Sequence, residues 1–394
     1  MNAKHATTVF LLAALTGGAL GADHYAITDL GSLGDAAVAT GINDNGIATG
    51  YAVDLLYRYH GFTSDGNTFT PITTMGMTSQ GHAMGINDND QVIVASYMLG
   101  QLTTTALRYD GGMAMPMMLG GFMPTAINNT STVVGSRYVT GAGGLRYEQA
   151  CSWTSGTLTT LGQLDGGTSS LALGVNDPGW AVGSATRPAA LKPTATLWIG
   201  TTPTDLGGLG GDWSQANAIN NQNQVVGIAH LPSGETHGFL FSLNGAGVVT
   251  QRTDLGILGD QYSTALAINN NGEVVGNSDN RAFVWNKGVM SDLNTLIDAN
   301  SGWILNNATG INDSGQIVGV GSLGGDPFRA FVLTPTDVCP ADFTHDGVLD
   351  IFDVFAFLDA FNAQDPIADL TGDSVFDIFD VFAYLDAFNA GCPA

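Results

Sequence analysis

The feature that most constrains this chain is an internal repeat of 41 to 49 residues, present seven times. Each copy contains a phrase close to Gly/Ala-Ile-Asn-Asp/Asn, then a few small or polar residues, then a short apolar run that commonly ends in glycine. The phrase begins at residues 41, 85, 126, 174, 218, 267 and 310. Two short apolar runs around an Asn/Asp/Gly-rich turn predict a β-hairpin whose turn accepts a positive φ.

Two other patterns recur between these hairpins. An aromatic run occurs at 106, 150, 195, 238, 282 and 330, and a run ending in Leu-Gly or a close variant occurs at 27, 159, 203, 252 and 290. Each repeat therefore contains about four short strands. Seven four-stranded units of this length predict a seven-bladed β-propeller over residues 22–334. A β-sandwich array and an open solenoid are the alternatives.

The two ends of the repeat region complement each other. Residues 27–35, Ile-Thr-Asp-Leu-Gly-Ser-Leu-Gly-Asp, match the last strand of a repeat whose first three strands are missing. The final copy, from 310 to 333, has the earlier strands and lacks that last one. We therefore expect the N-terminal strand to complete the last blade and close the ring, which an open solenoid would not require.

The repeats resemble the HAF family of extracellular repeats. The resemblance covers roughly residues 24–335 and lies in the Ile-Asn phrases, the Ala-Phe-x-Trp run at 282 and the Asp-Leu-Gly-x-Leu-Gly runs. Copy two departs from the pattern at Asp90 and Val94, and copy three lacks the turn glycine. The family implies an extracellular location but no particular activity.

The first 21 residues read as a secretory signal peptide. Lys4 and His5 precede an apolar run from Val9 to Leu15, and Ala19-Leu20-Gly21 offers small residues at a cleavage site after Gly21. The alternative, a membrane anchor, needs a longer apolar run. We expect a secreted or cell-surface protein with no membrane span.

Acidic residues are concentrated at the C-terminus. The net charge is −24, and from Asp337 onward there are 12 Asp and no Glu, Lys or Arg. A chain this acidic would repel the phosphates of nucleic acids, so we expect no nucleic-acid partner. The change in composition after Pro335 predicts a linker at 335–338 and a separate module at 339–394.

The module contains two loop sequences 27 residues apart, beginning at Ala341 and Ala368. A calcium loop needs oxygen ligands at its positions 1, 3, 5, 7, 9 and 12, and position 7 uses its backbone carbonyl. Loop one would supply Asp342, Thr344, Asp346, Val348, Asp350 and Asp353. Loop two would supply Asp369, Thr371, Asp373, Val375, Asp377 and Asp380. The sequence therefore predicts two calcium ions; a pair of solvated acidic turns is the alternative.

Aspartate at position 12, a helix starting within each loop and the tandem duplication resemble a type I dockerin. The resemblance covers 339–392 and implies paired F-hand calcium sites and docking to a cohesin-like partner. Thr344 and Thr371 replace the usual position-3 residue, and Ser374 replaces the turn glycine, so loop two is expected to bind more weakly. Ile351-Phe352 and Ile378-Phe379 replace the small polar pair that helps to select the cohesin.

The cysteines give one expected disulfide. Cys339 and Cys392 bracket the module, and in an exported chain they are expected to pair. Cys151 is left without a predicted partner, and we expect it to be a small buried residue of a strand and not a reactive thiol.

The two predicted helices have too many large apolar residues to bury against each other. The stretches at 350–363 and 377–390 agree at 13 of 14 positions. An exposed aromatic surface implies a partner or self-association, and a fully self-satisfied core is the alternative. The predicted partner-binding residues are Ile351, Phe352, Phe355, Ile378, Phe379 and Phe382.

No HExxH, GxSxG, CxxC or Walker A motif occurs. The sequence therefore favours a non-catalytic, exported propeller that presents a ligand surface and is tethered by its calcium module to a cohesin-like or cell-surface partner. A carbohydrate is a candidate ligand. The alternatives are a polysaccharide-active enzyme and a self-associating envelope component. The turn asparagines are expected to bond the backbone; Asp44, Asp88, Asp177 and Asp313 could instead hold cations.

Overall fold

The structure is a computed structural model. It describes residues 25–74, 79–98, 104–118, 121–141, 144–187, 190–336, 341–344, 348–365, 368–371 and 375–391. The chain divides into two compact units, one of which is Tyr25–Pro335 and the other of which includes Thr336–Ala394. Each unit is described separately below.

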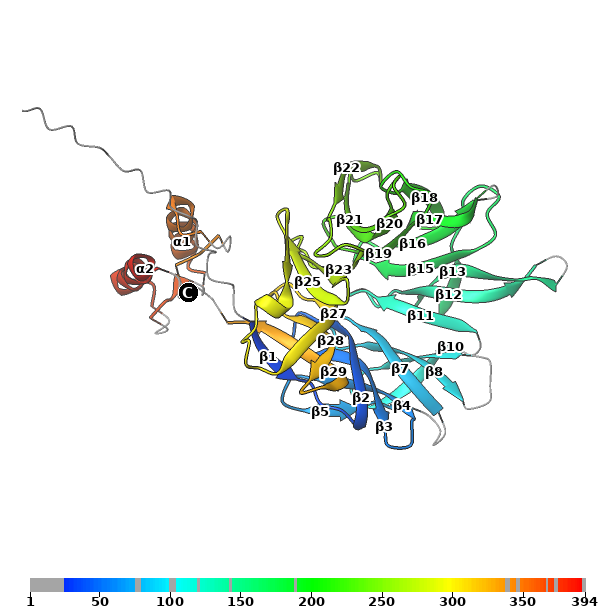
Figure 1. Ribbon diagram of the computed structural model, residues 1–394, viewed down its shortest axis with the longest axis horizontal. Coiled ribbons are helices and arrows are strands. Elements are labelled where there is room, and N and C mark those ends of the chain that lie inside the picture. Colours follow the sequence, from blue (N-terminus) through cyan, green and yellow to red (C-terminus); the bar gives the residue numbers. More distant parts are fainter. Residues whose placement is uncertain are drawn as a thin grey trace, which may run out of the picture. The chain divides into compact units, whose positions relative to one another are not determined.

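The described part of Tyr25–Pro335 forms seven antiparallel sheets arranged around a central axis (Figure 1). The first blade contains β2 (Gly34–Ile42), β3 (Ala48–Asp54), β4 (Tyr59–Ser64) and β5 (Phe69–Pro71). The second contains β7 (Ser79–Ile86), β8 (Val92–Met98), β9 (Thr104–Tyr109) and β10 (Met113–Met118), with β6 (Thr73–Thr74) parallel to β10. The third contains β11 (Phe122–Ile127), β12 (Val133–Thr140), β13 (Arg146–Thr154) and β14 (Thr157–Thr160), and the fourth contains β15 (Ser170–Val175), β16 (Trp180–Arg187), β17 (Ala190–Ile199) and β18 (Thr202–Gly207).

The other three blades follow the same order. The fifth blade contains β19 (Ser214–Ile219), β20 (Gln224–His230), β21 (Thr236–Leu243) and β22 (Val249–Asp254). The sixth contains β23 (Ser263–Ile268), β24 (Val274–Ser278), β25 (Arg281–Asn286) and β26 (Val289–Asp292). The seventh contains β27 (Trp303–Ile311), β28 (Ile317–Leu323) and β29 (Asp326–Pro335), together with β1 (Tyr25–Asp29). The short 3₁₀ helix η2 (Leu293–Thr295) follows β26. The predicted seven-bladed β-propeller is confirmed.

The ring closes by strand exchange, as the complementary chain ends predicted. β1 pairs antiparallel with β29 from Tyr25 opposite Pro335 to Asp29 opposite Phe331. An ion pair between Asp29 and Arg329 adds to the backbone pairing. The last blade is therefore built from both ends of the repeat region, so opening the ring requires this pairing to break.

The core lies between neighbouring blades, because every blade buries both of its faces. One buried cluster joins Val182 and Leu197 of the fourth blade to Phe239 and Phe241 of the fifth. Cys151 lies in another of these clusters, where it is fully buried, and burial raises the pKa of its thiol. The prediction of a small buried strand residue at Cys151 is confirmed.

The hairpin turns have the conformation that the sequence predicted. The fourth residue of each turn has a positive φ in all seven blades, and four of these residues are glycine. Asp90, Ser131 and Asn223 adopt the same left-handed conformation at φ 59°, 61° and 59°. The copies without a turn glycine therefore keep the turn and accept a local backbone cost.

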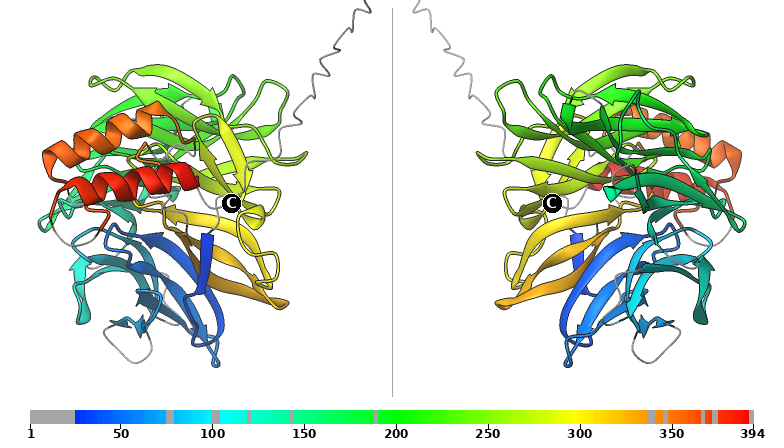
Figure 2. Two further views of the ribbon diagram at one scale, coloured as in Figure 1. Left: turned by 90° about the vertical axis from the view of Figure 1, so that its left-hand side faces the viewer. Right: turned by 90° about the vertical axis from the view of Figure 1, so that its right-hand side faces the viewer.

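The C-terminal unit contains two helices, α1 (Ile351–Ala363) and α2 (Ile378–Ala390), which lie side by side in Figure 2. The rings of Phe357 and Tyr384 stack between them, with centroids 4.1 Å apart and planes 3° from parallel. Ala341 and Ala368 complete a small buried core. The predicted α-helical second unit is confirmed.

Candidate functional site

The seven Ile-Asn turns meet at one end of the propeller axis. There the seven asparagines Asn43, Asn87, Asn128, Asn176, Asn220, Asn269 and Asn312 are all buried. Each Oδ1 accepts the backbone N–H four residues later, at 2.8–3.0 Å. The predicted bonds from these side chains to their own turns are confirmed.

The other half of each amide joins one blade to the next. Each Nδ2 donates to the backbone carbonyl of the corresponding asparagine in the following blade, at 2.7–3.1 Å. The last of these bonds runs from Asn312 back to Asn43, so the seven bonds form a closed cycle. The local sequence pattern did not predict this ring, although an asparagine in all seven copies was the available signal.

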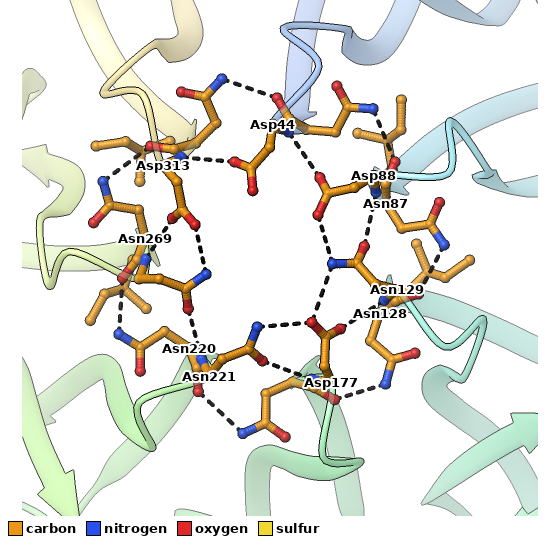
Figure 3. A pocket seen from close by; sticks show the side chains of 18 of the residues that line it. Asp44, Asn87, Asp88, Asn128, Asn129, Asp177, Asn220, Asn221, Asn269 and Asp313 are labelled. Atoms are coloured by element: carbon orange, nitrogen blue, oxygen red, sulfur yellow. Dashed lines mark hydrogen bonds between the residues drawn. The ribbon is translucent and has the colours of Figure 1, made fainter. Parts of the chain in front are cut away.

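A second ring lies directly beside the first and faces the axis (Figure 3). It consists of the residues that follow those asparagines: Asp44, Asp88, Asn129, Asp177, Asn221, Asn270 and Asp313. Each backbone N–H donates to the side-chain Oδ1 of the next member, at 2.7–2.9 Å, and this ring also closes. The two rings line a cavity of about 160 Å³.

Charge is distributed unevenly around this second ring. Asn129 Nδ2 donates to Oδ2 of both Asp88 and Asp177. Asn221 Nδ2 also donates to Oδ2 of Asp177, and Asn270 Nδ2 donates to Oδ2 of Asp313. Asp44 lies between Asp313 and Asp88 and accepts no side-chain amide in this ring. Burial raises the pKa of Asp44 and the neighbouring carboxylates of Asp88 and Asp313 raise it further, whereas the N–H of Asp313 lowers it.

Replacing Asp44 by Asn should therefore stabilise the propeller. A carboxyl group whose pKa is raised by folding loses free energy when it ionises, so Asp44 lowers stability at pH 7 and stops doing so below pH ~3.8. We expect Asp44→Asn to raise the free energy of unfolding by about 0.5 kcal/mol, a small gain because the side chain is exposed. The measurement is the guanidinium midpoint at pH 7 and again near pH 3.

Asp177→Asn is the matched control, because Asp177 already accepts two amides and has amide-bearing neighbours on both sides. It should lower the midpoint or leave it unchanged. A midpoint that millimolar calcium raises in wild type but not in Asp44→Asn would instead support the alternative of a cation in the ring.

In the C-terminal unit, the described part of each predicted calcium loop surrounds one buried aspartate. Asp353 Oδ1 accepts the N–H of Thr344 at 2.9 Å and its hydroxyl at 2.8 Å, and Asp353 Oδ2 accepts the N–H of Asp350 at 2.9 Å. Loop two repeats this arrangement with Asp380, Thr371 and Asp377. The predicted position-3, position-9 and position-12 residues therefore come together in both loops.

The same contacts start each helix. Asp350 caps α1 and Asp353 is the reciprocal member of a capping box; Asp377 and Asp380 do the same for α2. Burial opposes ionisation of Asp353, but the N–H groups of Asp350 and Thr344 and the Thr344 hydroxyl hold the pKa of Asp353 below its usual range. The N–H of Asp377 likewise lowers the pKa of Asp380. Both carboxyl groups are therefore ionised at neutral pH.

The other predicted loop residues are placed as follows. Asp342 is buried, its Oδ1 accepts the Thr344 hydroxyl at 3.4 Å, and Asp369 makes the equivalent contact with Thr371. Val348 and Val375 are exposed. Asp346, Asp373, Cys339 and Cys392 lie outside the described residues, as does the predicted signal peptide. Among the residues that are described, no group of three His, Cys, Asp or Glu side chains has metal-binding geometry.

The six predicted partner-binding residues are all exposed. Ile351 and Ile378 are 55% and 54% exposed, Phe352 and Phe379 63% and 62%, and Phe355 and Phe382 55% and 53%. Leu358 and Leu385 extend the same faces. The alternative of a fully self-satisfied core is therefore wrong, because the helices bury only Phe357 and Tyr384 among their large apolar residues.

Comparisons with known proteins give no family and only distant structural similarities. No family model matches the chain, and no curated protein matches it. Solved structures that it resembles include TolB from Acinetobacter baumannii, at 10% identity and TM-score 0.40 over 73% of this chain and 63% of that one. Another is YCF48 bound to D1 peptide, at 12% identity and TM-score 0.46 over 80% and 96% of the two chains. A third is the β-propeller domain of the Trilobed protease from Pyrococcus furiosus, at 10% identity and TM-score 0.37 over 66% and 95%.

Similarity at this level carries no information about activity, and the chain spans 63% of TolB. In the part of the chain that the structure describes, no helix has the length and apolar character needed to cross a membrane. The chain therefore forms a seven-bladed β-propeller, followed in sequence by a small unit of two helices.

Proposed function

We propose that this protein is an exported, non-catalytic scaffold whose propeller presents a ligand surface and whose C-terminal unit docks onto a partner protein in a calcium-dependent manner. The observation that carries the proposal is the exposure of matched apolar side chains on α1 and α2. Side chains as large as Phe352 and Phe379 are not expected to face water in pairs unless a partner covers them.

Calcium fits the chemistry of the two loops. Asp342, Asp353 and Asp380 are buried carboxylates, and the sequence from Asp337 onward contains no Lys or Arg to balance them. Buried carboxylates need a counter-charge, and oxygen ligands with this spacing favour Ca²⁺. The residues that would hold the two ions are the carboxylates at positions 1, 5, 9 and 12 of each loop, with Thr344 or Thr371 at position 3.

A buried hydroxyl marks a difference between the two halves. Phe357 of α1 corresponds to Tyr384 of α2, and the Tyr384 Oη is buried without a hydrogen-bond partner among the described residues. Burial, together with the charges of Asp353 and Asp342, raises the pKa of Tyr384 to about 12. The phenol of Tyr384 therefore stays protonated and neutral at physiological pH.

The charge of the helical unit also restricts its partner. Two copies of a unit that has many Asp and no Lys or Arg repel each other, so a second copy of this unit is a poor occupant of these faces. The partner that fits is a different protein with an apolar groove and basic side chains at its rim. A cohesin-like module or another cell-surface protein meets this description.

Site-specific photo-crosslinking tests the docking. A photoreactive residue in place of Phe355 or Phe382, in the full chain returned to its own cells, should give one discrete adduct that is lost when calcium is chelated. The control position is Phe328 of the propeller, which is 60% exposed and should give none. Equal crosslinking at Phe328 and Phe355, or no adduct at either helix, would contradict the proposal.

A further inference from the structure

A second cavity, of about 300 Å³, lies between the sixth and seventh blades. β23 and β27 form part of its wall, and the side chains that matter are Tyr262, Thr264, Asn277, Asn280, Asn306 and Asn307. Its volume is at the lower end of the range of small-molecule sites. Its lining residues do not belong to the repeated Ile-Asn turns that form the axial rings.

The cavity coincides with an irregularity in β27. The inner strands β7, β11, β15, β19 and β23 each have one register shift against their neighbours, two to three residues before the turn asparagine. β2 and β27 each have the corresponding shift and an additional one, which in β27 lies between Leu305 and Asn307. Bulges of this kind re-aim side chains and are common beside functional sites. Here the extra bulge brings Asn306 and Asn307 together at the cavity.

The wall is held in place by bonds among its own polar groups. Asn277 Nδ2 donates to the Asn306 carbonyl at 2.7 Å, and Asn306 Nδ2 donates to the Asn280 carbonyl at 3.2 Å. Asp279 accepts the backbone N–H of Tyr262 at 3.1 Å, which fixes the approach to the aromatic side chain. Asp279 and Asn280 form a tight turn with φ of 50° and 60°, a conformation that leaves the Asn280 side chain at the cavity.

One acceptor in this wall is unsatisfied. Asn307 Oδ1 is buried and has no hydrogen-bond partner among the described residues. A buried amide oxygen without a donor lowers stability, and such groups are rare in native proteins unless a ligand or water completes them. The bonding partner that Asn307 requires is a donor such as a hydroxyl group.

The cavity is also uncharged, in a protein whose net charge is −24. Amide side chains both donate and accept hydrogen bonds, as vicinal hydroxyl groups do, and Tyr262 and Leu266 supply an apolar surface. An ion would find no opposite charge among these side chains. We infer that this cavity binds a sugar residue of a neutral glycan. This inference deepens the ligand-presenting role proposed for the propeller and rests on it, but not on docking by the helical unit.

Binding of neutral glycans to the intact protein tests the inference. The probes are cellobiose, maltose and lactose, with digalacturonate as the charged comparison, and saturation-transfer NMR and calorimetry detect binding. We expect at least one neutral disaccharide to bind and digalacturonate not to bind. Tyr262→Ala should weaken binding at least tenfold, and Tyr57→Ala, in an exposed hairpin turn of the first blade, should leave it unchanged.

Asn307→Leu separates a binding role from a structural one. It removes the unsatisfied oxygen and keeps the branched shape of the side chain, so we expect the melting temperature of the ligand-free protein to rise by roughly 2 °C while glycan binding falls at least tenfold. No binding of any neutral probe, preferential binding of digalacturonate, or unchanged binding in both cavity variants would overturn the inference. Loss of calcium-dependent crosslinking at Phe355 would leave these results unaffected, so the two proposals fail separately.

Discussion

Chelation of calcium should unfold the two-helix unit and leave the propeller intact. The loops contain buried carboxylates with no Lys or Arg to neutralise them, so metal binding and folding are expected to be coupled. With a micromolar dissociation constant, 1 mM Ca²⁺ would stabilise each site by about 4 kcal/mol. That is a large share of the stability of so small a unit.

The sequence provides separate reporters for the two units. All six tryptophans lie between Trp153 and Trp303, within the propeller, whereas α1 and α2 are the only α-helices among the described residues. Excess chelator should reduce the helical circular dichroism signal near 222 nm without shifting tryptophan emission. Restored calcium should recover the signal. Unchanged circular dichroism in chelator would refute the assignment of the loops.

A pair of variants assigns the effect to one loop. Asp353→Asn removes a charge at position 12 and should abolish the response of loop one, whereas Asp359→Asn removes an equal charge from the exposed face of α1 and should not. A calorimetric titration should show two sites in the wild-type chain and one in Asp353→Asn. Equal effects of the two variants would indicate general charge repulsion in place of a specific site.

Gly227→Ala should strongly destabilise the propeller. A Cβ atom at Gly227 would lie 2.0 Å from the carbonyl oxygen of Gln215 and 2.8 Å from Cζ of Phe239. Because the obstructing atom belongs to the backbone of a paired strand, it cannot move aside cheaply. We expect the free energy of unfolding to fall by about 3 kcal/mol, measured from guanidinium midpoints at constant calcium.

Gly245→Ala is the control for this substitution. A Cβ atom at Gly245 would have no neighbour within 4 Å, and its φ is not in the left-handed region. Its midpoint should stay within about 0.5 kcal/mol of wild type. A similar loss at both glycines would mean that backbone flexibility, and not the space beside the Gln215 carbonyl, explains the requirement for glycine.

The same close approach explains a repeated glycine that the sequence showed without its reason. In six blades, a Cβ atom at the final glycine of the hairpin phrase would lie 1.9–2.0 Å from a carbonyl of the inner strand. These glycines are Gly50, Gly135, Gly183, Gly227, Gly276 and Gly319. In the second blade Val94 takes this place, opposite Ala83, and the missing side chain of Gly81 leaves room for Val94 Cγ1. The bulge that causes the crowding has no local sequence signal.

The repeat spacing, turn residues and complementary chain ends were sufficient to predict the blades, the turns and the exchange of β1 onto β29. They were sufficient because the blades and turns depend on residues close together in the chain, and the strand exchange follows from counting the strands of each repeat. The axial rings and the cavity at Asn307 were not predictable in this way. Each depends on an amide contact between residues far apart in the chain, 44 positions for Asn43 and Asn87 and 29 for Asn277 and Asn306, and the sequence around one Asn does not show which distant group it will contact.

The seven Nδ2-to-carbonyl bonds and the seven N–H-to-Oδ1 bonds of the axial rings all run in the same rotational sense, so in these two cycles each repeat is a donor toward one neighbour and an acceptor toward the other. Such head-to-tail contacts close whenever the rotation per unit divides a full circle, whatever the number of units. The hydrogen bonds of the Asn and Asp residues therefore do not determine that there are seven blades. The number of blades follows from the angle between neighbouring blades, which the apolar side chains packed between them set. Duplicating or deleting one whole repeat would leave every bond of these two cycles with a donor and an acceptor, and the side-chain volumes between the blades would oppose it.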